Sequence, residues 1–429
     1  MREPLLFLVL ASALAGMKRY FIFGVLAFGF TGVTAKEEAE WTRFRGPNGT
    51  GHGLAKGLPV QWTNKDYSWK VKLPGVGHSS PVLWGDRLFT TCADEGDGAQ
   101  YVLCYDALNG EKIWEKKLQS VKYLHHKFNS FASATPCVDA DNLYVNWTTK
   151  ASNDLLCFDH DGKLRWRRDF GGYETQHGNG FSPIVHGELV VLTHDHYGKS
   201  SVVAVDRKTG KTKWQTDRSS AKPSSSTPCI YQPKDGPLQF VTSSMAHGCY
   251  GVEAKTGKIL WETGPGTLDL RSVASPYPAN GRFFASCGSG GRASRFAAVI
   301  PPKGGLGKAV VAYSLKKNIP YVPTSIAKGN LLFFITDGGI ASCLDLATGE
   351  MKWRERLGGN YFASPILVDD VIYAVSREGE VFAIAPTDKY QVLGKSLLGE
   401  LTYNTPAVAN GSIYFRTYSQ LFRLPGKKN

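Results

Sequence analysis

The sequence lacks the patterns that mark several common classes of protein. After residue 40, no long segment repeats apolar residues at the helical interval of about 3.6 residues, so few helices are expected. The formal net charge is +13, yet lysines and arginines are scattered and form no dense basic run. A nucleic-acid surface would cluster them. We therefore predict a β-rich chain with no nucleic-acid partner.

Catalytic signatures are also missing. No Gly-x-Ser-x-Gly element occurs, and residues 304–308 resemble a phosphate loop only superficially, because Ala309 follows the lysine. The eight cysteines include no CxxC pair and no adjacent pair. Several occupy equivalent positions of the repeat described below, which favours small buried side chains. Cys92 and Cys104 could nevertheless pair across neighbouring strands if the protein is exported.

Residues 1–35 have the features of a signal peptide. Lys18-Arg19 precede an apolar run at 20–30, and small residues at 33–35 precede a charged segment. We predict that Met17 is the true start and that residues 1–16 are a mis-assigned extension. The alternative is an uncleaved anchor, although the run is shorter than the roughly 20 residues that a span needs. No cysteine follows it, so no lipid anchor is expected. A periplasmic or secreted protein without a stable membrane span is predicted.

One repeated pattern dominates the rest of the chain. In residues 202–214 an apolar strand ends at Asp206, a turn contains Gly210, and a second strand closes on Trp214. A period of roughly 40–50 residues predicts an array of similar units. A residue type that recurs in every unit is expected to repeat one packing role. We therefore predict that the following tryptophans dock neighbouring units: Trp69, Trp114, Trp166, Trp214, Trp261 and Trp353.

A second recurring mark gives the number of units. A small or polar residue followed by proline begins an apolar stretch at Ser80, Thr135, Ser182, Thr227, Ser275, Val322, Ser364 and Thr405. Proline suits the first residue of a strand. Residues 182–216 contain four short strands separated by turns, which is the blade of a β-propeller. Residues 62–429 are therefore predicted to form one all-β, eight-bladed propeller, preceded by an irregular leader at 36–61.

The ends of the chain predict how the ring closes. Residues 67–73, including Trp69, look like a fourth strand without a blade, and the last blade has only three strands of its own. Pairing them would remove the open edges. Two blades depart from the pattern. The fifth has Tyr313 near the expected tryptophan and an insertion at 288–308, and the seventh has residues 386–393 in place of the usual turn.

The stretch from Ala204 to Trp214 resembles the pyrroloquinoline quinone (PQQ) repeat, and residues 41–51 are similar to the leader of exported bacterial PQQ-repeat propellers of unknown function. The resemblance implies an eight-bladed propeller. The chain is also distantly similar to the outer-membrane barrel assembly propeller. The family includes PQQ-dependent alcohol dehydrogenases and non-enzymatic members, and the fold alone does not choose between them.

The segments before the proline marks should converge at one mouth of the central channel. They are rich in imidazole, amide and aromatic side chains, which together in a concavity predict a ligand site. The predicted ligand-binding residues are His78, Asn129, His177, Asn179, Arg271, Asn360, Tyr361 and Asn404.

Cofactor and metal sites are predicted only as alternatives. His194, Asp195 and His196 are weak metal candidates, because no third ligand is defined. A PQQ and calcium site needs oxygen ligands and a carboxylate base, and the resemblance implies a pair of adjacent cysteines. The mouth segments are poor in Asp and Glu, so we expect no cofactor and keep PQQ with calcium as the alternative.

These observations favour a monomeric, exported binding or scaffold protein whose loop-rich face meets a protein or an extracellular glycan. Two alternatives stay open. One is a PQQ- and calcium-dependent alcohol or sugar dehydrogenase. The other is a factor for assembly of the cell envelope or of outer-membrane proteins.

Overall fold

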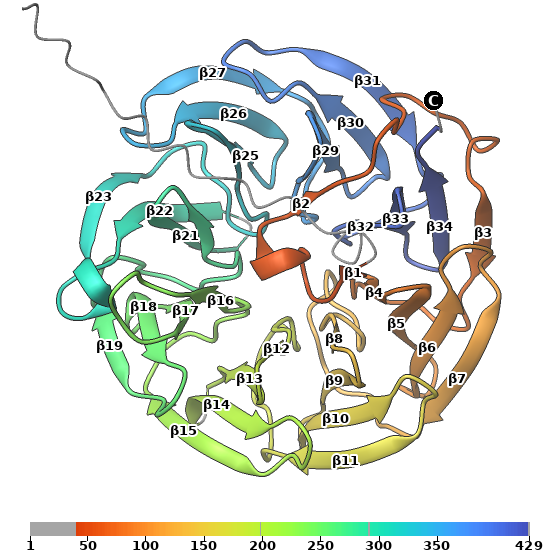
Figure 1. Cartoon of the computed structure of the whole chain (residues 1–429), viewed down its shortest axis with the longest axis horizontal. Coiled ribbons are helices and arrows are strands. Elements are labelled where there is room, and N and C mark those ends of the chain that lie inside the picture. Colours follow the sequence, from red (N-terminus) through yellow and green to blue (C-terminus); the bar gives the residue numbers. More distant parts are fainter. Residues whose placement is uncertain (1–39, 198, 291, 428–429) are drawn as a thin grey trace, which may run out of the picture.

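The computed structural model describes residues 40–427 except 198 and 291. In this part of the chain the regular structure consists of strands and two short 3-10 segments. The strands form eight small sheets around one axis (Figure 1). The prediction of a single eight-bladed propeller is confirmed. The predicted signal peptide at 1–35 lies outside the described residues.

Each blade is an antiparallel sheet of four strands, with the first strand nearest the axis (Figure 1). The first blade comprises β4 (Val82–Trp84), β5 (Arg87–Ala93), β6 (Gln100–Asp106) and β7 (Lys112–Leu118). The second comprises β8 (Cys137–Val138), β9 (Asn142–Thr148), β10 (Asn153–Asp159) and β11 (Leu164–Asp169). The third comprises β12 (Ile184–His186), β13 (Leu189–His194), β14 (Ser200–Asp206) and β15 (Thr212–Arg218). The fourth comprises β16 (Cys229–Tyr231), β17 (Gln239–Ser244), β18 (Gly248–Glu253) and β19 (Ile259–Glu262).

The remaining blades follow the same order. The fifth comprises β20 (Tyr277–Ala279), β21 (Arg282–Ser289), β22 (Arg292–Ile300) and β23 (Val310–Leu315). The sixth comprises β24 (Ile326–Lys328), β25 (Leu331–Ile335), β26 (Ile340–Asp345) and β27 (Met351–Arg356). The seventh comprises β28 (Ile366–Val368), β29 (Val371–Val375), β30 (Glu380–Ile384) and β31 (Val392–Leu397). The eighth comprises β32 (Ala407–Ala409), β33 (Ser412–Arg416), β34 (Gln420–Pro425) and, from the N-terminal side, β3 (Trp69–Lys72).

The ring closes as the sequence predicts. Strand β3 pairs antiparallel with β34, Trp69 lying opposite Arg423 and Lys72 opposite Gln420. Strand β34 also pairs with β33, so the C-terminal strand lies between an N-terminal strand and the rest of the last blade. The core lies between neighbouring blades; for example, Val82 and Phe89 of the first blade share one cluster with Leu143 of the second.

Two sequence predictions about individual blades need correction. The sixth blade does not start at Val322-Pro323: Ile326 lies opposite Phe333 as Tyr277 lies opposite Phe284 in the fifth blade, so Thr324 is the residue equivalent to Ser275. The predicted start of this blade, Val322, therefore lies two residues before the structural equivalent, Thr324. The insertion predicted at 288–308 is in large part strand, because β21 and β22 extend past their counterparts before the loop at 301–309.

The repeated tryptophan connects five of the eight blades to the next one. Trp214 Nε1 donates a hydrogen bond of 2.8 Å to the carbonyl oxygen of Ala254, in the turn of the following blade. Trp69, Trp114, Trp166 and Trp353 make the equivalent bond to Ala107, His160, Arg207 and Thr387. Trp261 differs, because the fifth blade lacks the turn and its Nε1 donates to Gln239 of its own blade.

The turn glycine is required by this contact. Gly210 has φ +68°, and a Cβ there would lie 2.7 Å from the ring of Trp166. Both the backbone conformation and the close approach of the ring exclude a larger residue. The Asp–Gly turn and the tryptophan are therefore two halves of one joint between blades.

The two irregular blades replace the missing tryptophan in different ways. Tyr313 takes its position in the fifth blade and donates to the carbonyl oxygen of Leu346 at 3.1 Å. In the seventh blade Gly394 lies opposite Ala383, where other blades carry the indole. The leader passes over this glycine, and Trp62 stacks on Phe415 of the eighth blade with ring centroids 5.4 Å apart. The leader thus supplies the indole that the seventh blade lacks.

We expect the Trp214→Ala variant to lose roughly 3–5 kcal/mol of unfolding free energy, because it removes a buried indole and leaves a cavity between two blades. Trp214→Phe keeps most of the ring contacts and loses the hydrogen bond to Ala254, so it should cost less. Urea unfolding followed by far-ultraviolet circular dichroism measures both values. Equal losses in the two variants would contradict the packing role.

All eight cysteines lie in the described part of the chain as buried, unpaired thiols. Cys92 and Cys104 do not form the disulfide that the sequence left open. Burial raises the pKa of Cys104 to about 12, and a thiol held in its protonated form is a poor nucleophile. The cysteines are packing residues.

Residues 41–53 of the leader lie in the centre of the ring rather than on its outside (Figure 1). Strand β1 (Glu40–Trp41) pairs with β4 of the first blade, and β2 (His52–Gly53) pairs parallel with β28 of the seventh. Between them the Arg45 side chain is fully buried and donates to the carbonyl oxygens of Thr324, Ser325 and Pro365, in the sixth and seventh blades. The leader, which the sequence predicted only as an irregular segment, is therefore a central staple that joins several blades.

Candidate functional site

A cavity of about 440 Å³ lies at one end of the propeller axis. Phe44 of the leader lines it, and the leader fills the centre of the ring beside the first strands (Figure 1). The leader therefore occupies the central channel and forms the floor of the cavity. Its volume falls in the usual range for small-molecule sites.

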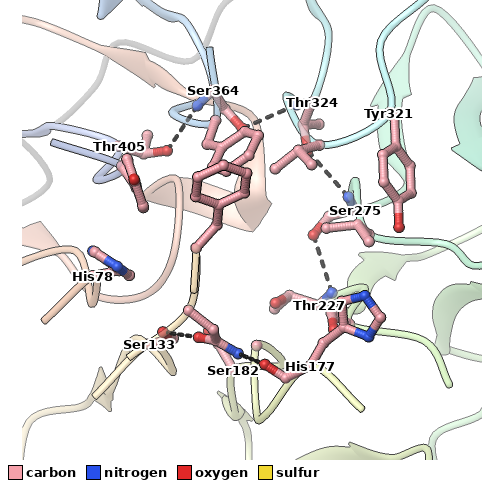
Figure 2. Close-up of a pocket in the computed structure, with 18 of the residues that line it drawn as sticks. His78, Ser133, His177, Ser182, Thr227, Ser275, Tyr321, Thr324, Ser364 and Thr405 are labelled. Carbon is pink, nitrogen blue, oxygen red and sulfur yellow. Dashed lines mark hydrogen bonds between the residues drawn. The ribbon is translucent and has the colours of Figure 1, made fainter. Parts of the chain in front are cut away.

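A ring of hydroxyl groups, one from each blade, lines the cavity: Ser80, Thr135, Ser182, Thr227, Ser275, Thr324, Ser364 and Thr405. Six of these oxygens accept a backbone N–H from the preceding blade. For example, the N–H of Thr324 donates to Ser364 at 2.9 Å, and that of Ser364 donates to Thr405 at 3.0 Å. Figure 2 shows these bonds joining the labelled hydroxyls around one opening. They explain why serine or threonine recurs before the proline.

The residue two positions before each hydroxyl forms a second ring on the cavity wall: His78, Ser133, Gly180, Ser225, Val273, Val322, Phe362 and Tyr403. In extended backbone, alternate side chains point to the same side. This alternation directs the side chains two positions before the hydroxyls toward the axis. It also explains why three of the predicted site residues miss the cavity.

Four predicted ligand residues line the cavity and four do not. His78, Asn129, His177 and Arg271 are on its wall. Asn179 instead donates to Asn146 at 2.7 Å, and Asn404 donates to the carbonyl oxygen of Arg416 at 3.2 Å. Tyr361 packs in the core between two blades, and Asn360 donates a hydrogen bond to Glu378. All four side chains therefore stabilise the scaffold. Asn179, Tyr361 and Asn404 stand at odd offsets from the hydroxyl ring, so their side chains point away from the axis.

The strongest charge on the wall is Arg271, whose side chain belongs to a residue only 6% exposed. Its Nη1 lies 2.9 Å from Nε2 of His177, and its Nε has no hydrogen-bond partner among the described residues. Burial, and then the neighbouring guanidinium, lower the pKa of His177 to about 4. His177 is therefore neutral at pH 7 and accepts from the arginine. His126 also lines the cavity and stacks on His177 with ring centroids 5.2 Å apart.

An aromatic wall stands on another side of the cavity. The guanidinium carbon of Arg377 lies 4.1, 4.8 and 5.1 Å from the ring centroids of Phe128, Phe362 and Tyr403. All three rings line the cavity. The Arg377 charge fixes them by cation–π contact. Phe128 and Phe362 were missed from the sequence; the two-residue offset from the proline mark would have indicated Phe362.

Among the described residues that line the cavity, Asp337 alone carries a carboxylate. Its oxygens accept backbone N–H groups of Tyr321 at 2.8 Å and Val322 at 3.3 Å. Burial raises the pKa of Asp337 to about 6. Calcium takes six to eight oxygen ligands, several of them usually carboxylates. The described lining offers one, already engaged with the backbone, so its donor set does not suit the calcium of a quinone site.

The raised pKa of Asp337 predicts a pH effect on stability. A carboxyl whose folded pKa exceeds its unfolded value stabilises the protein fully below about pH 4, and this contribution is lost as the pH rises through about 6. We expect Asp337→Asn to remove that slope while keeping an acceptor for Tyr321. Urea unfolding at pH 4, 5, 6 and 7 measures it. Parallel pH profiles of the variant and the parent would contradict the prediction.

The weak metal candidates are used elsewhere. Asp195 is buried in an ion pair with Arg218, and the rings of His194 and His196 stack 4.5 Å apart. The ring of His247 hydrogen-bonds Glu262. Within residues 40–427, gaps excepted, no group of three or more His, Cys, Asp or Glu side chains is arranged to hold a metal.

Comparison with known proteins gives the family. A family model described as outer membrane protein assembly factor BamB matches residues 98–354 and 314–392. The chain belongs to this family. It is a PQQ-repeat propeller, as the sequence resemblance implied. No curated protein matches the sequence.

Solved structures share the fold of this family member at low identity. BamB from Moraxella catarrhalis is 12% identical, with TM-score 0.59 over 85% of this chain and 98% of that one. A europium-containing methanol dehydrogenase is 10% identical, with TM-score 0.62 over 90% and 91%. Quinohemoprotein alcohol dehydrogenase from Comamonas testosteroni is 12% identical, with TM-score 0.62 over 92% and 82%. At these identities the likeness establishes the architecture alone. In the part of the chain that the structure describes, no helix is long and apolar enough to cross a membrane.

Proposed function

We propose that the protein is an exported binding protein that holds its ligand in the cavity at the loop-rich end of the propeller. The observation that carries the proposal is the cavity itself. It is backed by the leader, lined by aromatic rings and hydroxyls, and has a buried guanidinium on its wall. Clefts with apolar walls and a few convergent polar groups are the usual form of ligand sites. Export is supported by the apolar segment and small residues before residue 36.

The lining supports binding better than quinone-dependent oxidation. A dehydrogenase of this architecture would need a calcium site and a carboxylate base, and Asp337 alone would have to serve both. The adjacent cysteines that the resemblance implies are absent. We propose that no calcium and no PQQ are needed for the function.

A role in envelope assembly is the second candidate, because the matching family model is described as an outer-membrane protein assembly factor. Such a factor would recognise a protein through the surface of the loops. The cavity would then be incidental, and filling it would leave the interaction unchanged. This difference separates the two candidates.

A cavity-filling variant tests the proposal. Val273 lines the cavity, so Val273→Trp should block it, whereas Val310→Trp places the same side chain at an exposed site on β23. Isothermal titration with acidic and neutral oligosaccharides, and with PQQ with and without calcium, measures binding. At least one compound should bind one-to-one to the parent and the Val310 variant and at least tenfold more weakly to the Val273 variant. Binding that is insensitive to Val273→Trp, no binding at all, or oxidation of an alcohol or sugar with PQQ and calcium would overturn the proposal.

A further inference from the structure

We propose that the cavity binds the uronate end of an acidic glycan, with Arg271 holding the sugar carboxylate. This inference rests on the proposed function and names its ligand class. It is carried by three observations on the described lining: a buried guanidinium without a carboxylate partner, a ring of hydroxyl groups and an aromatic wall.

The charge of Arg271 calls for an anion. Arg271 is only 6% exposed, and it makes no ion pair with a carboxylate among the described residues. The nearby imidazole of His177 is a neutral acceptor and the neighbouring phenol of Tyr321 is also neutral, so neither carries the negative charge that would compensate the guanidinium. A buried charge without a partner is costly. A ligand carboxylate in the cavity that contacts the guanidinium would supply the missing charge, because guanidinium and carboxylate form strong charge-assisted hydrogen bonds.

The hydroxyl ring calls for a ligand with several hydroxyl groups. In six positions the oxygen accepts a backbone N–H of the preceding blade, as Thr135 does from Ser80 at 3.0 Å. Each of these six side chains still has its own O–H to donate, and none of the six donates to an acceptor among the described residues. An aromatic carboxylate would leave such donors unused. A sugar ring presents hydroxyl oxygens around its whole edge.

The aromatic wall completes the fit. Phe128, Phe362 and Tyr403 present apolar faces to the cavity and are fixed from one side by Arg377. The carbon-bound hydrogens of a pyranose can pack on such faces while its hydroxyls reach the ring of serines and threonines. The two guanidinium groups disfavour cations. The volume of about 440 Å³ accommodates the end of a chain rather than a long segment.

Titration calorimetry with digalacturonate, its methyl ester, the neutral disaccharide lactose and PQQ tests the inference. Digalacturonate should bind the parent protein, and its methyl ester at least tenfold more weakly, because the ester removes the charge that meets Arg271. Arg271→Gln should weaken digalacturonate at least tenfold, and Arg271→Lys less. Arg354→Gln removes the same charge from an exposed site on β27 and should change nothing. Thermal unfolding of each variant shows whether it is folded, and the ester comparison on the parent does not depend on any variant.

The outcomes separate this inference from the proposed function. If lactose or PQQ binds and Val273→Trp blocks it while digalacturonate does not bind, the cavity is a ligand site but the uronate assignment is wrong. Equal affinity for digalacturonate and its ester, or an unchanged affinity in Arg271→Gln, also overturns the assignment. If no compound binds in the cavity, both proposals fail.

Discussion

Replacing Arg45 by methionine is expected to lower the free energy of unfolding by roughly 3–5 kcal/mol, because several buried carbonyl oxygens lose a charged hydrogen-bond donor. The guanidinium contacts Thr324, Ser325 and Pro365 in two blades and also Gly49 and Thr50 in the leader itself. Burial without a carboxylate has a cost of its own, and it lowers the pKa of Arg45 to about 10. We expect the loss of hydrogen bonds to five carbonyl oxygens to destabilise the protein by more than removing the buried charge stabilises it.

The size of the effect also follows from the position of Arg45. The leader links β4 of the first blade to β28 of the seventh through β1 and β2, and Arg43 and Asn48 contact the fourth blade between them. Releasing Arg45 therefore loosens contacts to several blades at once. It should also weaken ligand binding, because Phe44 next to it lines the cavity.

Urea unfolding measures the prediction for Arg45. Arg45→Lys keeps the charge but cannot reach the same set of acceptors, so an intermediate loss is expected. Arg354→Met, an exposed position on the outer strand β27, is the matched control and should stay within about 0.5 kcal/mol of the parent. If Arg45→Met unfolds at the same urea concentration as that control, the leader is not a structural staple.

Ending the chain after Ser419 is expected to abolish cooperative unfolding. The deletion removes β34, which pairs with both β33 and β3. It also removes Leu421, Phe422 and Leu424, whose side chains are fully buried. Their burial contributes about 6 kcal/mol at about 2 kcal/mol each, which is comparable to the whole stability of an ordinary domain. Strand β3 would lose its partner, and β33 of the same blade would be left with an open edge.

Calorimetry and size-exclusion chromatography test the truncation. The shortened chain should show no single unfolding transition and should elute as aggregate. A chain ended after Lys427 retains every described strand and is the control. Leu421→Asp keeps the length of the chain and should lose several kcal/mol through a buried, unpaired charge. A truncated protein that melts near the parent temperature would show that the ring does not depend on its closure.

Much of the candidate site could have been predicted from the proline marks, but half of the predicted ligand residues lie away from the cavity. Residues two positions before the hydroxyl ring, such as His78 and Tyr403, line it, whereas Asn404, one residue from Thr405, serves the scaffold. A shift of one residue in extended backbone reverses the direction of the side chain. The offset could be measured only once the true start of each blade was known, and in the sixth blade the mark at Val322 was displaced from Thr324.

The sequence by itself determined the number of blades, the closure by Trp69 and the tryptophan–glycine joints, because each depends on short-range patterns that repeat along the chain. Only the tertiary structure decided where the leader lies and what surrounds the cavity. Arg45 and Arg271 meet partners far away in the chain, and nothing local to either residue reveals them. Packing around a common axis brings one residue from every blade to the cavity. The chemistry of the cavity therefore depends on all eight blades and not on the sequence of any one repeat.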